Sequence, residues 1–320
     1  MCWQPSASLL AVRERAALLA RIRDFFRALG VLEVETPIAS RSATTDPALS
    51  SLATRWHGAG APLYLQTSPE LAMKRLLAAG SGPIYQICKV FRDDERGRLH
   101  HPEFTLLEWY RPGWDYHRLM TEVAELARAA LLQPLLPDER IAYRDLFREG
   151  LGLDPWEADA QALSRAAQAQ GIGDAARLRL THDGWLDLLL SHCLAPSLGR
   201  GRLTFVYDYP PSQALLARCR DQRSGPVAER FELFVEGLEL ANGFQELTEA
   251  GEQRWRFNQD VAARVAKGQS VAPIDEAFLA AIAAGLPDCA GVALGIDRLL
   301  MRRLDVGAID DVLAFPIERA

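Results

Sequence analysis

Two apolar segments joined by a charged loop are the feature that most limits how this chain can fold. Residues 84–91 and 104–109 are apolar and strand-like, and the polar stretch between them is typical of a loop. Further strand-like segments at residues 204–209, 230–240 and 292–294 are separated by irregular stretches instead of regular βαβ units. This arrangement favours antiparallel pairing. We therefore predict an α+β fold, with a mainly antiparallel sheet flanked by helices.

Several other segments have helical patterns. In residues 8–29 apolar side chains recur at helical spacing, Gly30 stands where a left-handed cap would end the helix, and residues 31–35 alternate as in a short strand. A second helix is expected to start at Ser68-Pro69-Glu70, with Ser68 as N-cap and Glu70 in the positive first turn. The remaining helices are predicted over residues 116–132, 158–170, 247–266 and 296–304.

One domain is the organisation that we predict. The chain has 320 residues, of which 49% are hydrophobic, so it can bury a substantial core, although composition alone also fits two small domains. Residues 134–201 have the weakest patterning and contain several turn-forming Gly and Pro residues. We interpret this segment as an insertion into a single domain that spans residues 1–320.

Charge and cysteine content argue against several classes of protein. The formal net charge is −6 and no Lys/Arg-dense run occurs, which disfavours nucleic acid as the main partner. The five cysteines are widely spaced and form no C-x-x-C pair, as expected in a reducing compartment without a zinc site. A basic-then-apolar leader and an apolar run of about 18 residues are both missing. We expect a soluble cytoplasmic enzyme without membrane association.

The charged loop, residues 92–103, carries groups that suit a nucleoside triphosphate. Arg92 leaves the first strand, Asp93, Asp94 and Glu95 follow it, and Phe104 begins the returning strand. A guanidinium can hold phosphate oxygens, carboxylates can reach donors or a metal, and an aromatic ring can stack on a base. The alternative interpretation is a solvated hairpin tip, where charged residues are normal.

A second stretch places acids among apolar residues. Glu232, Glu236 and Glu239 interrupt the apolar pattern of the strand expected over residues 230–240, and Glu232 and Glu236 share one face unless Gly237 forms a bulge. Buried acids require a cation, and Mg²⁺ on bound phosphates or an ammonium substrate would satisfy them. A solvated acidic face is the alternative.

A third stretch is a glycine-containing turn from a strand into a helix. Gly295 allows the backbone to approach a ligand at the helix start, and Arg298 lies in the first helical turn. The stretch is no Walker loop, since no Gly-Lys-Ser/Thr follows, and it lacks the G-x-G-x-x-G spacing. Taken alone, it is a weak signal.

In order along the chain, these stretches resemble motifs 1, 2 and 3 of the class II aminoacyl-tRNA synthetases. Motif 1 corresponds to the helix that ends in residues 30–37, motif 2 to residues 91–104 and motif 3 to residues 295–298. The lysyl branch is indicated by Ser68-Pro69-Glu70, by Pro102-Glu103-Phe104-Thr105 with Glu108 and Tyr110, and by Asn242-Gly243-Phe244 with Glu246. The resemblance covers nearly the whole chain and implies the class II catalytic fold, with a motif 1 interface in a homodimer.

Within that branch the chain looks like the elongation factor P (R)-β-lysine ligases. Lysyl-tRNA synthetases have an anticodon-reading OB-fold before motif 1, whereas here the motif 1 helix is expected almost at the first residue. Residues 108–112 and 288–295 are similar to the ligase family, and Ala293 stands where lysyl-tRNA synthetases generally carry Gly. The added methyl is expected to favour (R)-β-lysine. The resemblance implies elongation factor P as protein substrate and no tRNA charging.

The resemblance also assigns roles to residues. It implies that an amino-acid carboxylate attacks the α-phosphate of ATP, with Mg²⁺ as cofactor, and that the adenylate then acylates a lysine ε-amine of elongation factor P. Arg92 and Arg298 are the expected catalytic residues. The expected ATP-binding residues are Arg92, Asp93, Asp94, His101, Phe104, Glu239, Leu240, Gly295 and Arg298. The expected amino-acid-binding residues are Ser68, Glu70, Glu108, Tyr110, Asn242, Glu246 and Ala293, and the expected Mg²⁺ ligands are Glu232 and Glu239.

Two positions depart from the family pattern. Arg92-Asp93-Asp94 stands where the family usually has Arg-Asn-Glu, and His101 stands where Asn is common. Two alternatives remain open: a truncated lysyl-tRNA synthetase-like ligase that uses α-lysine, and a non-catalytic regulatory paralogue. Such paralogues commonly lose the arginines of motifs 2 and 3, yet Arg92 and Arg298 are both present.

Overall fold

The computed structural model describes residues 3–58, 60–93 and 95–320, which form two compact units. Along the chain, unit 1 takes in Met1–Asp115, Ala129–Leu132 and Glu246–Ala320. Unit 2 takes in Tyr116–Arg128 and Gln133–Gln245. The segment predicted as an insertion, residues 134–201, falls within unit 2.

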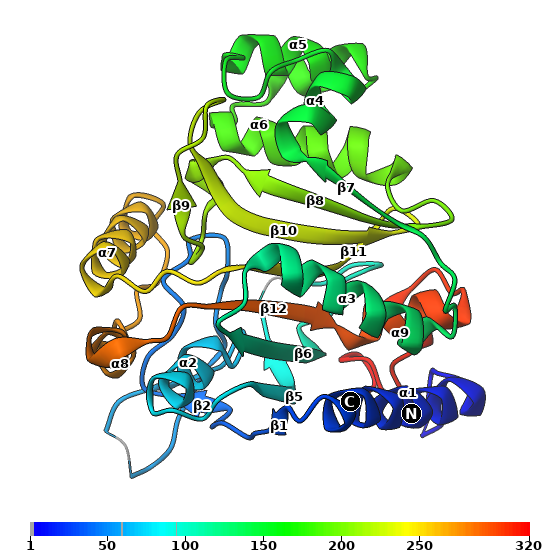
Figure 1. Cartoon of the computed structure of the whole chain (residues 1–320), viewed down its shortest axis with the longest axis vertical. Coiled ribbons are helices and arrows are strands. Elements are labelled where there is room, and N and C mark those ends of the chain that lie inside the picture. The colour runs from blue at the N-terminus through cyan, green and yellow to red at the C-terminus, as the bar shows by residue number, and fades with distance from the viewer. Residues whose placement is uncertain (1–2, 59, 94) are drawn as a thin grey trace. The chain divides into compact units, whose positions relative to one another are not determined.

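The main sheet of unit 1 is mostly antiparallel. Its strands lie in the order β1 (Leu32–Glu33), β5 (Ile84–Phe91), β6 (Glu103–Pro112) and β12 (Cys289–Gly295) (Figure 1). β1 runs parallel to β5, while β5 with β6 and β6 with β12 are antiparallel. The predicted hairpin around the charged loop is therefore confirmed, as is the α+β class. A separate small sheet contains β2 (Ala39–Ser40), β4 (Leu63–Leu65) and β3 (Ala53–Thr54) in that order.

Helix α1 (Leu9–Ala28) packs its apolar stripe on this sheet. The Ser8 hydroxyl caps the helix by accepting the Ala11 N–H at 3.1 Å, and Gly30 after its end has a φ of +66°. On its inner face Phe26 stacks on Tyr85 of β5 with ring centroids 4.4 Å apart, and it meets Trp109 of β6 edge-on. These aromatic contacts fix one face of the sheet.

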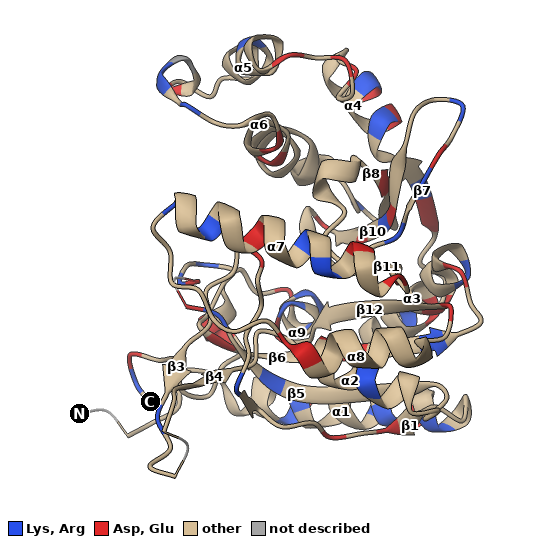
Figure 2. Ribbon diagram, turned by 90° about the vertical axis from the view of Figure 1, so that its left-hand side faces the viewer, with Lys and Arg blue, Asp and Glu red and all other residues tan. Residues whose placement is uncertain are grey.

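The other helices of unit 1 are α2 (Glu70–Ala78), α7 (Ala250–Ala266), α8 (Glu276–Gly285) and α9 (Ile296–Leu304), followed by the 3₁₀ turn η5 (Ile309–Asp311). Basic and acidic residues are interspersed along α7 (Figure 2), which fits the prediction that no basic run is present. The predicted helix at residues 247–266 begins three residues late, at Ala250. Helix α2 begins at Glu70, so the predicted N-cap was wrong by one residue: Pro69 caps the helix, and Ser68 Oγ instead accepts the Glu70 N–H at 3.2 Å.

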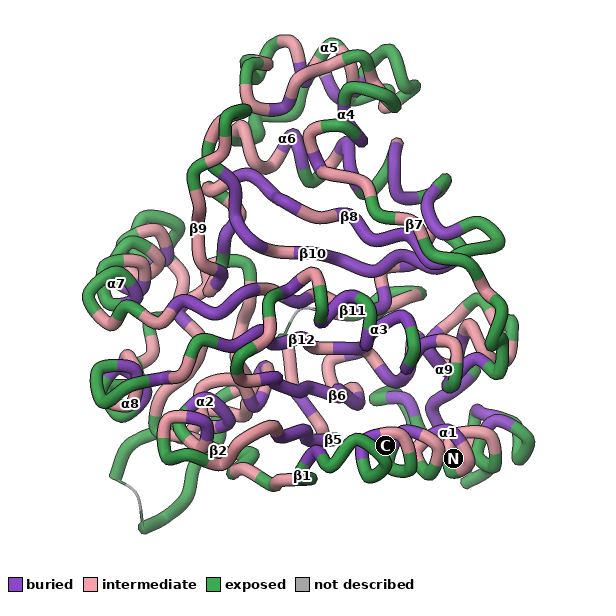
Figure 3. The backbone as a smooth tube through the Cα atoms, viewed as in Figure 1, coloured by how far each residue is buried: buried purple, intermediate pink, exposed green. Residues whose placement is uncertain are grey.

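Unit 2 contains a second group of paired strands. β11 (Leu238–Gln245), β10 (Val227–Val235) and β8 (Leu203–Tyr209) are antiparallel neighbours, β7 (Asp138–Ala142) runs parallel to β8, and β9 (Cys219–Arg220) pairs with β10. β8 and β10 are buried along most of their length (Figure 3). This burial explains why both were recognisable as apolar runs in the sequence.

Helices cover the strands of unit 2. They are α3 (Tyr116–Leu131, in unit 2 as far as Arg128), α4 (Tyr143–Leu151), α5 (Ala160–Ala169) and α6 (His182–Leu189), with a π-helical turn η2 (Leu190–Leu194) and 3₁₀ turns η1 (Ala175–Arg177), η3 (Ala195–Ser197) and η4 (Pro211–Gln213). Their core joins Tyr143 and Phe147 of α4 to Tyr209 of β8, with both ring pairs 4.7 Å apart. The weakly patterned segment is thus regularly folded.

A hairpin turn replaces the single strand predicted over residues 230–240. Glu236 and Gly237 have φ values of +49° and +76°, and they connect β10 directly to β11. Positive φ at both turn residues matches the right-handed twist of the flanking strands. Glu236 therefore does not share a strand face with Glu232; its Oε1 accepts the Gly201 N–H at 2.7 Å.

The cysteines and the possibility of a membrane-spanning helix can be checked along the described residues. Cys88, Cys193, Cys219 and Cys289 are free thiols, and Cys2 lies outside the described residues. Within the described ranges no helix has the length and apolar character needed to span a membrane.

Candidate functional site

One face of β6 brings several predicted residues together in unit 1. Side chains alternate along a strand, so Phe104, Glu108 and Tyr110 share a face. Glu108 lies between Gln86 of β5 and Ala293 of β12 in the register. Tyr110 lies between Ile84 and Gly291, and Gly295 is opposite Leu106, again on this face. The register thus places the predicted ATP-stacking ring and the predicted amino-acid-binding residues along one strand.

Three carboxylates gather in unit 1 from different elements. We call Glu70 of α2, Glu108 of β6 and Glu246, which follows β11, the acidic cluster. The hydroxyl of Tyr110 donates to Glu108 Oε1 at 2.6 Å. Lys74, one helical turn after Glu70, places its Nζ 2.5 Å from Glu70 Oε1 and also pairs with the Glu246 carboxylate. Lys74 of the chain itself is thus one cation that contacts these acids.

Burial changes the protonation of these groups. Burial, reinforced by the charge of Glu70, raises the pKa of Glu108 to about 8. Burial also raises the pKa of Glu246 to about 8, although the neighbouring Lys74 ammonium opposes this shift. Burial tends to lower the pKa of Lys74, but the charges of Glu246 and Glu70 outweigh it and raise that pKa overall. The cluster therefore favours cations strongly.

Gly291 gives the cluster its shape. A Cβ at this position would lie 2.4 Å from Glu246 Oε1 and 2.4 Å from Cε1 of Tyr110, closer than any real Cβ contact. A side chain here would displace one of the two groups. Gly291 and Lys74 are absent from the predicted site residues. A glycine in a strand interior and a Lys four residues after Glu70 were the available signals.

Arg92 and Phe104 lie close together where the charged loop joins β5 and β6. The guanidinium carbon of Arg92 is 5.0 Å from the centre of the Phe104 ring, and its Nη1 is 3.5 Å from a carboxylate oxygen of Glu95. Its Nε donates to the Thr67 carbonyl at 3.4 Å. The Asp93 N–H donates to the Ser50 carbonyl at 2.8 Å, while Asp94 lies outside the described residues.

Arg298 joins the start of α9 to the same loop. Its Nη2 is 2.8 Å from Nε2 of His100, and its Nε donates to the Leu99 carbonyl at 3.4 Å. The preceding Gly295 leaves space beside the Arg298 side chain, since an added Cβ would approach it only to 3.8 Å. Asp297 anchors the helix start by accepting the Thr105 N–H at 2.6 Å and by pairing with Arg15 of α1.

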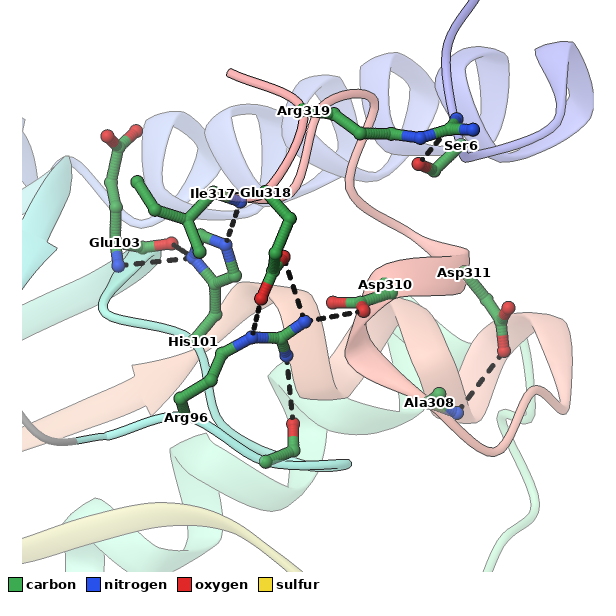
Figure 4. A network of polar contacts seen from close by, with 11 residues as sticks. Ser6, Arg96, His101, Glu103, Ala308, Asp310, Asp311, Ile317, Glu318 and Arg319 are labelled. Carbon is green, nitrogen blue, oxygen red and sulfur yellow. Dashed lines mark hydrogen bonds and ion pairs between the residues drawn. The ribbon is translucent and has the colours of Figure 1, made fainter. Parts of the chain in front are cut away.

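The far end of the charged loop is fastened by the C-terminal segment (Figure 4). Arg96 pairs with Glu318 at 2.6 Å and with Asp310 at 2.8 Å. His101, predicted to bind ATP, uses both ring nitrogens on the chain itself: Nδ1 is 2.6 Å from the Glu103 carbonyl oxygen, and Nε2 accepts the Ile317 N–H at 2.9 Å. These contacts give His101 a role in holding the loop.

The predicted Mg²⁺ ligands belong to unit 2. Glu232 of β10 stands opposite Asn242 of β11, and Glu239 is opposite Phe234. Burial raises the pKa of Glu232 to about 7, with Arg230 opposing and Glu239 adding to the shift. Arg230 holds both neighbours, with Nη2 2.5 Å from Glu232 Oε1 and Nε 3.0 Å from Asn242 Oδ1. Leu240, also predicted, is buried in β11.

These two carboxylates fit Mg²⁺ only in part. In the described part of the chain, no group of three or more His, Cys, Asp or Glu residues is arranged to hold a metal. Mg²⁺ usually takes one or two carboxylates together with phosphate oxygens and water. The charges of Glu232 and Glu239 repel each other, and a bound cation would relieve this repulsion.

Comparison with known proteins yields a consistent picture. Residues 5–319 match the family model of class II tRNA synthetases (D, K and N). The chain is 49% identical to the elongation factor P (R)-β-lysine ligase of Pectobacterium atrosepticum, over 99% of this chain and 98% of that protein. It is 49% identical to the corresponding ligase of Salmonella dublin, over the same shares of the two chains.

Proposed function

The chain belongs to the class II tRNA synthetase family (D, K and N), and on that basis we propose that it is an ATP-dependent elongation factor P (R)-β-lysine ligase. It activates (R)-β-lysine as an aminoacyl adenylate and transfers it to the ε-amino group of a lysine on elongation factor P. The observation that carries the proposal is the buried acidic cluster, because desolvated carboxylates require cations, and a diamino acid supplies two ammonium groups. The names of the two relatives supply the isomer and the acceptor.

Activation needs positioning and charge neutralisation. A carboxylate oxygen of the amino acid attacks the α-phosphorus of ATP, and the bond to the pyrophosphate oxygen breaks. Arg92 is the residue proposed to hold the α-phosphate and the attacking carboxylate. Phe104 would stack on adenine, and Arg298 would hold the γ-phosphate. The guanidinium carbon of Arg92 lies 5.0 Å from the centre of the Phe104 ring, so the residue proposed to hold the α-phosphate is already beside the ring proposed to stack on adenine.

The proposal also includes Mg²⁺ as cofactor. Glu232 and Glu239 remain the proposed ligands of Mg²⁺, which when bound neutralises phosphate charge. Arg230 holds Glu232 and Asn242 in fixed rotamers, so it acts as a positioning residue for both. Asp93, Leu240 and Gly295 stay as proposed backbone or side-chain contacts to ATP.

Transfer forms an amide. The neutral ε-amine of the acceptor lysine attacks the adenylate carbonyl carbon, AMP leaves with the bonding electron pair, and the amine loses a proton. Glu70, Glu108, Tyr110 and Glu246 are proposed to hold the two amino groups of the donor, with Ser68, Asn242 and Ala293 lining its chain. No tRNA charging is expected.

We also propose a homodimer in the cytoplasm. Apolar side chains of motif 1 are exposed: Leu9, Leu10, Val12, Leu29 and Leu32. Apolar residues repeated along one helix and the strand after it suit burial against a second copy. Sedimentation velocity at micromolar concentration should show a dimer, and a monomer at that concentration would contradict the proposal.

One experiment tests the whole activity. The protein is incubated with ATP, elongation factor P and either (R)-β-lysine or α-lysine, and the acceptor is weighed by mass spectrometry. ATP–pyrophosphate exchange is followed in parallel without acceptor. Modification with (R)-β-lysine in preference to α-lysine is expected. Preference for α-lysine would overturn the substrate, and exchange with neither isomer would favour a regulatory paralogue.

A further inference from the structure

Lys74 is the buried cation of the acidic cluster. It lies four residues after Glu70 on α2, so both side chains project from one face of the helix. Its ammonium bridges Glu70 and Glu246 and sits 5.9 Å from the centre of the Phe278 ring, and only 1% of its side chain is exposed. A fully buried Lys held by two carboxylates is a fixed charge, since burial prevents exchange with bulk cations.

The charges of the cluster do not balance. When ionised, Glu70, Glu108 and Glu246 carry three negative charges, and Lys74 neutralises one of them. The other titratable groups that interact with these residues in the described part of the chain include Tyr110 on β6, Cys88 on β5 and Cys289 on β12. Burial raises the pKa of all three, which keeps them neutral. With all three carboxylates ionised, two negative charges remain, and a ligand that supplies two ammonium groups would displace the protons that Glu108 and Glu246 hold at neutral pH.

One buried carboxylate oxygen of the acidic cluster is available to accept a hydrogen bond from a ligand ammonium group. Glu246 is 1% exposed, and its Oε1 has no hydrogen-bond partner among the described residues. This atom and the Tyr110 ring pack directly against Gly291, where a Cβ would lie 2.4 Å from each of them. An ammonium group that reached Glu246 Oε1 would satisfy it without disturbing the Lys74 pair.

We propose that Lys74 is a specificity-determining residue, whose fixed ammonium tunes the acidic cluster to ligands that carry two ammonium groups. This inference rests on the proposed function and adds to it a reason for the charge of the substrate. A ligand with one ammonium group leaves a buried carboxylate without a cation, which is unfavourable. Without Lys74 the cluster loses the cation that lowers the pKa of Glu108 and Glu246, so it holds more protons at neutral pH than the wild-type cluster does.

The experiment uses Lys74→Met, which keeps the volume of the side chain and removes its charge. Isothermal titration calorimetry measures binding of (R)-β-lysine and α-lysine at pH 7 in two buffers of different ionisation enthalpy. Weaker binding by about tenfold or more is expected, corresponding to about 1.4 kcal/mol. More protons should be released for each ligand bound, because the variant cluster holds more protons before binding. The KM for ATP should stay within about twofold of wild type.

Two controls separate charge from structure. Arg75→Met removes an exposed positive charge from the next position of α2 and should change neither affinity nor proton release. Lys74→Ala opens a cavity, in which added propylammonium should restore binding of the diamino acid, whereas n-propanol should not. Circular dichroism and thermal unfolding of each variant report whether the fold is intact.

Some outcomes overturn the inference alone. Suppose the wild-type protein binds (R)-β-lysine and Lys74→Met binds it with the same affinity and the same proton release. That result would overturn the inference about Lys74 and leave the proposed function standing. Equal rescue of Lys74→Ala by propylammonium and n-propanol would reduce Lys74 to a packing role. If the wild-type protein binds neither lysine isomer, the proposed function fails with it. Rescue by propylammonium alone supports the inference even where Lys74→Met folds poorly.

Discussion

Ala293 of β12 stands directly opposite Glu108 of β6 in the antiparallel register. Directly opposed side chains on one face have Cβ atoms about 5 Å apart, so the Ala293 methyl borders the Glu108 carboxylate. A change at position 293 therefore alters the space beside a group proposed to bind an amino group. It leaves the rest of the acidic cluster in place.

Ala293→Gly should shift substrate preference towards α-lysine. Removing one methyl from a binding site typically changes discrimination by about tenfold, so the ratio of kcat/KM for the two isomers should move by roughly that factor. ATP–pyrophosphate exchange with each isomer measures the ratio. Ala290→Gly is the matched control, because Ala290 is buried on the opposite face of β12. An unchanged ratio in Ala293→Gly would remove this position from the account of specificity.

Arg298→Ala should abolish adenylate formation while the protein stays folded. The side chain is the proposed contact to the γ-phosphate, and losing one such charged group typically lowers kcat by about 10² or more. Exchange activity is the measurement. Arg303→Ala on the same helix serves as control, since that arginine pairs with Glu14. Near-normal exchange by Arg298→Ala would refute its role with ATP.

Breaking the Arg96–Glu318 pair should weaken ATP binding. Arg96→Glu and Glu318→Arg each remove the ion pair that holds the charged loop against the C-terminal segment. The KM for ATP should rise by only about threefold, because exposed ion pairs are individually weak. The combined charge swap should restore the KM. The KM for the amino acid should not change in any of the three. A swap that behaves no better than the single variants would show that the pair does not position the loop.

Ligand binding should strengthen from pH 6 to pH 8.5. Burial raises the pKa of Glu108 and of Glu246 to about 8 from 4.5, so both are largely protonated at pH 6 and cannot attract ammonium groups fully. Between pH 4.5 and 8 the folded protein therefore holds more protons than the unfolded chain, and these groups reduce stability as pH rises. A bound diamino acid offsets that loss.

Thermal unfolding with and without ligand measures this linkage. The rise in Tm caused by (R)-β-lysine should be larger at pH 8 than at pH 6. Glu108→Gln should flatten the dependence, because it removes one of the two titrating carboxyls. A ligand-induced rise in Tm that is equal at both pH values would contradict the assignment of these two groups.

The strands and helix that carry the candidate site could be predicted in part, because local patterns determine them. The strand at residues 84–91 and the helix at 296–304 have the predicted bounds, since apolar runs with clear ends determine them. The strand predicted over residues 104–109 included Phe104 and Glu108, and in the structure it runs from Glu103 to Pro112, so that alternation puts Tyr110 on the same face as these two.

Other features of the structure could not be predicted, because they depend on contacts between residues that are far apart in the sequence or on an unusual residue in a turn. Glu236 occupies a positive-φ turn position where Asn or Gly is usual, so the apolar residues on either side concealed the hairpin. Lys74 has the sequence appearance of a solvated helical lysine, but it is buried and pairs with Glu246, which is distant in the chain. The Arg96–Glu318 pair likewise joins residues that are 222 positions apart in the sequence.

Gly291 has a consequence for how this protein can diverge. Its missing side chain is filled from one side by Tyr110 and from the other by Glu246. Positions 110, 246 and 291 should therefore covary: a relative with a side chain at 291 must shrink or reorient one of the other two. Natural sequences with Ala at 291 beside an unchanged Tyr and Glu are expected to be rare, and such a triple would mark a reshaped amino-acid site.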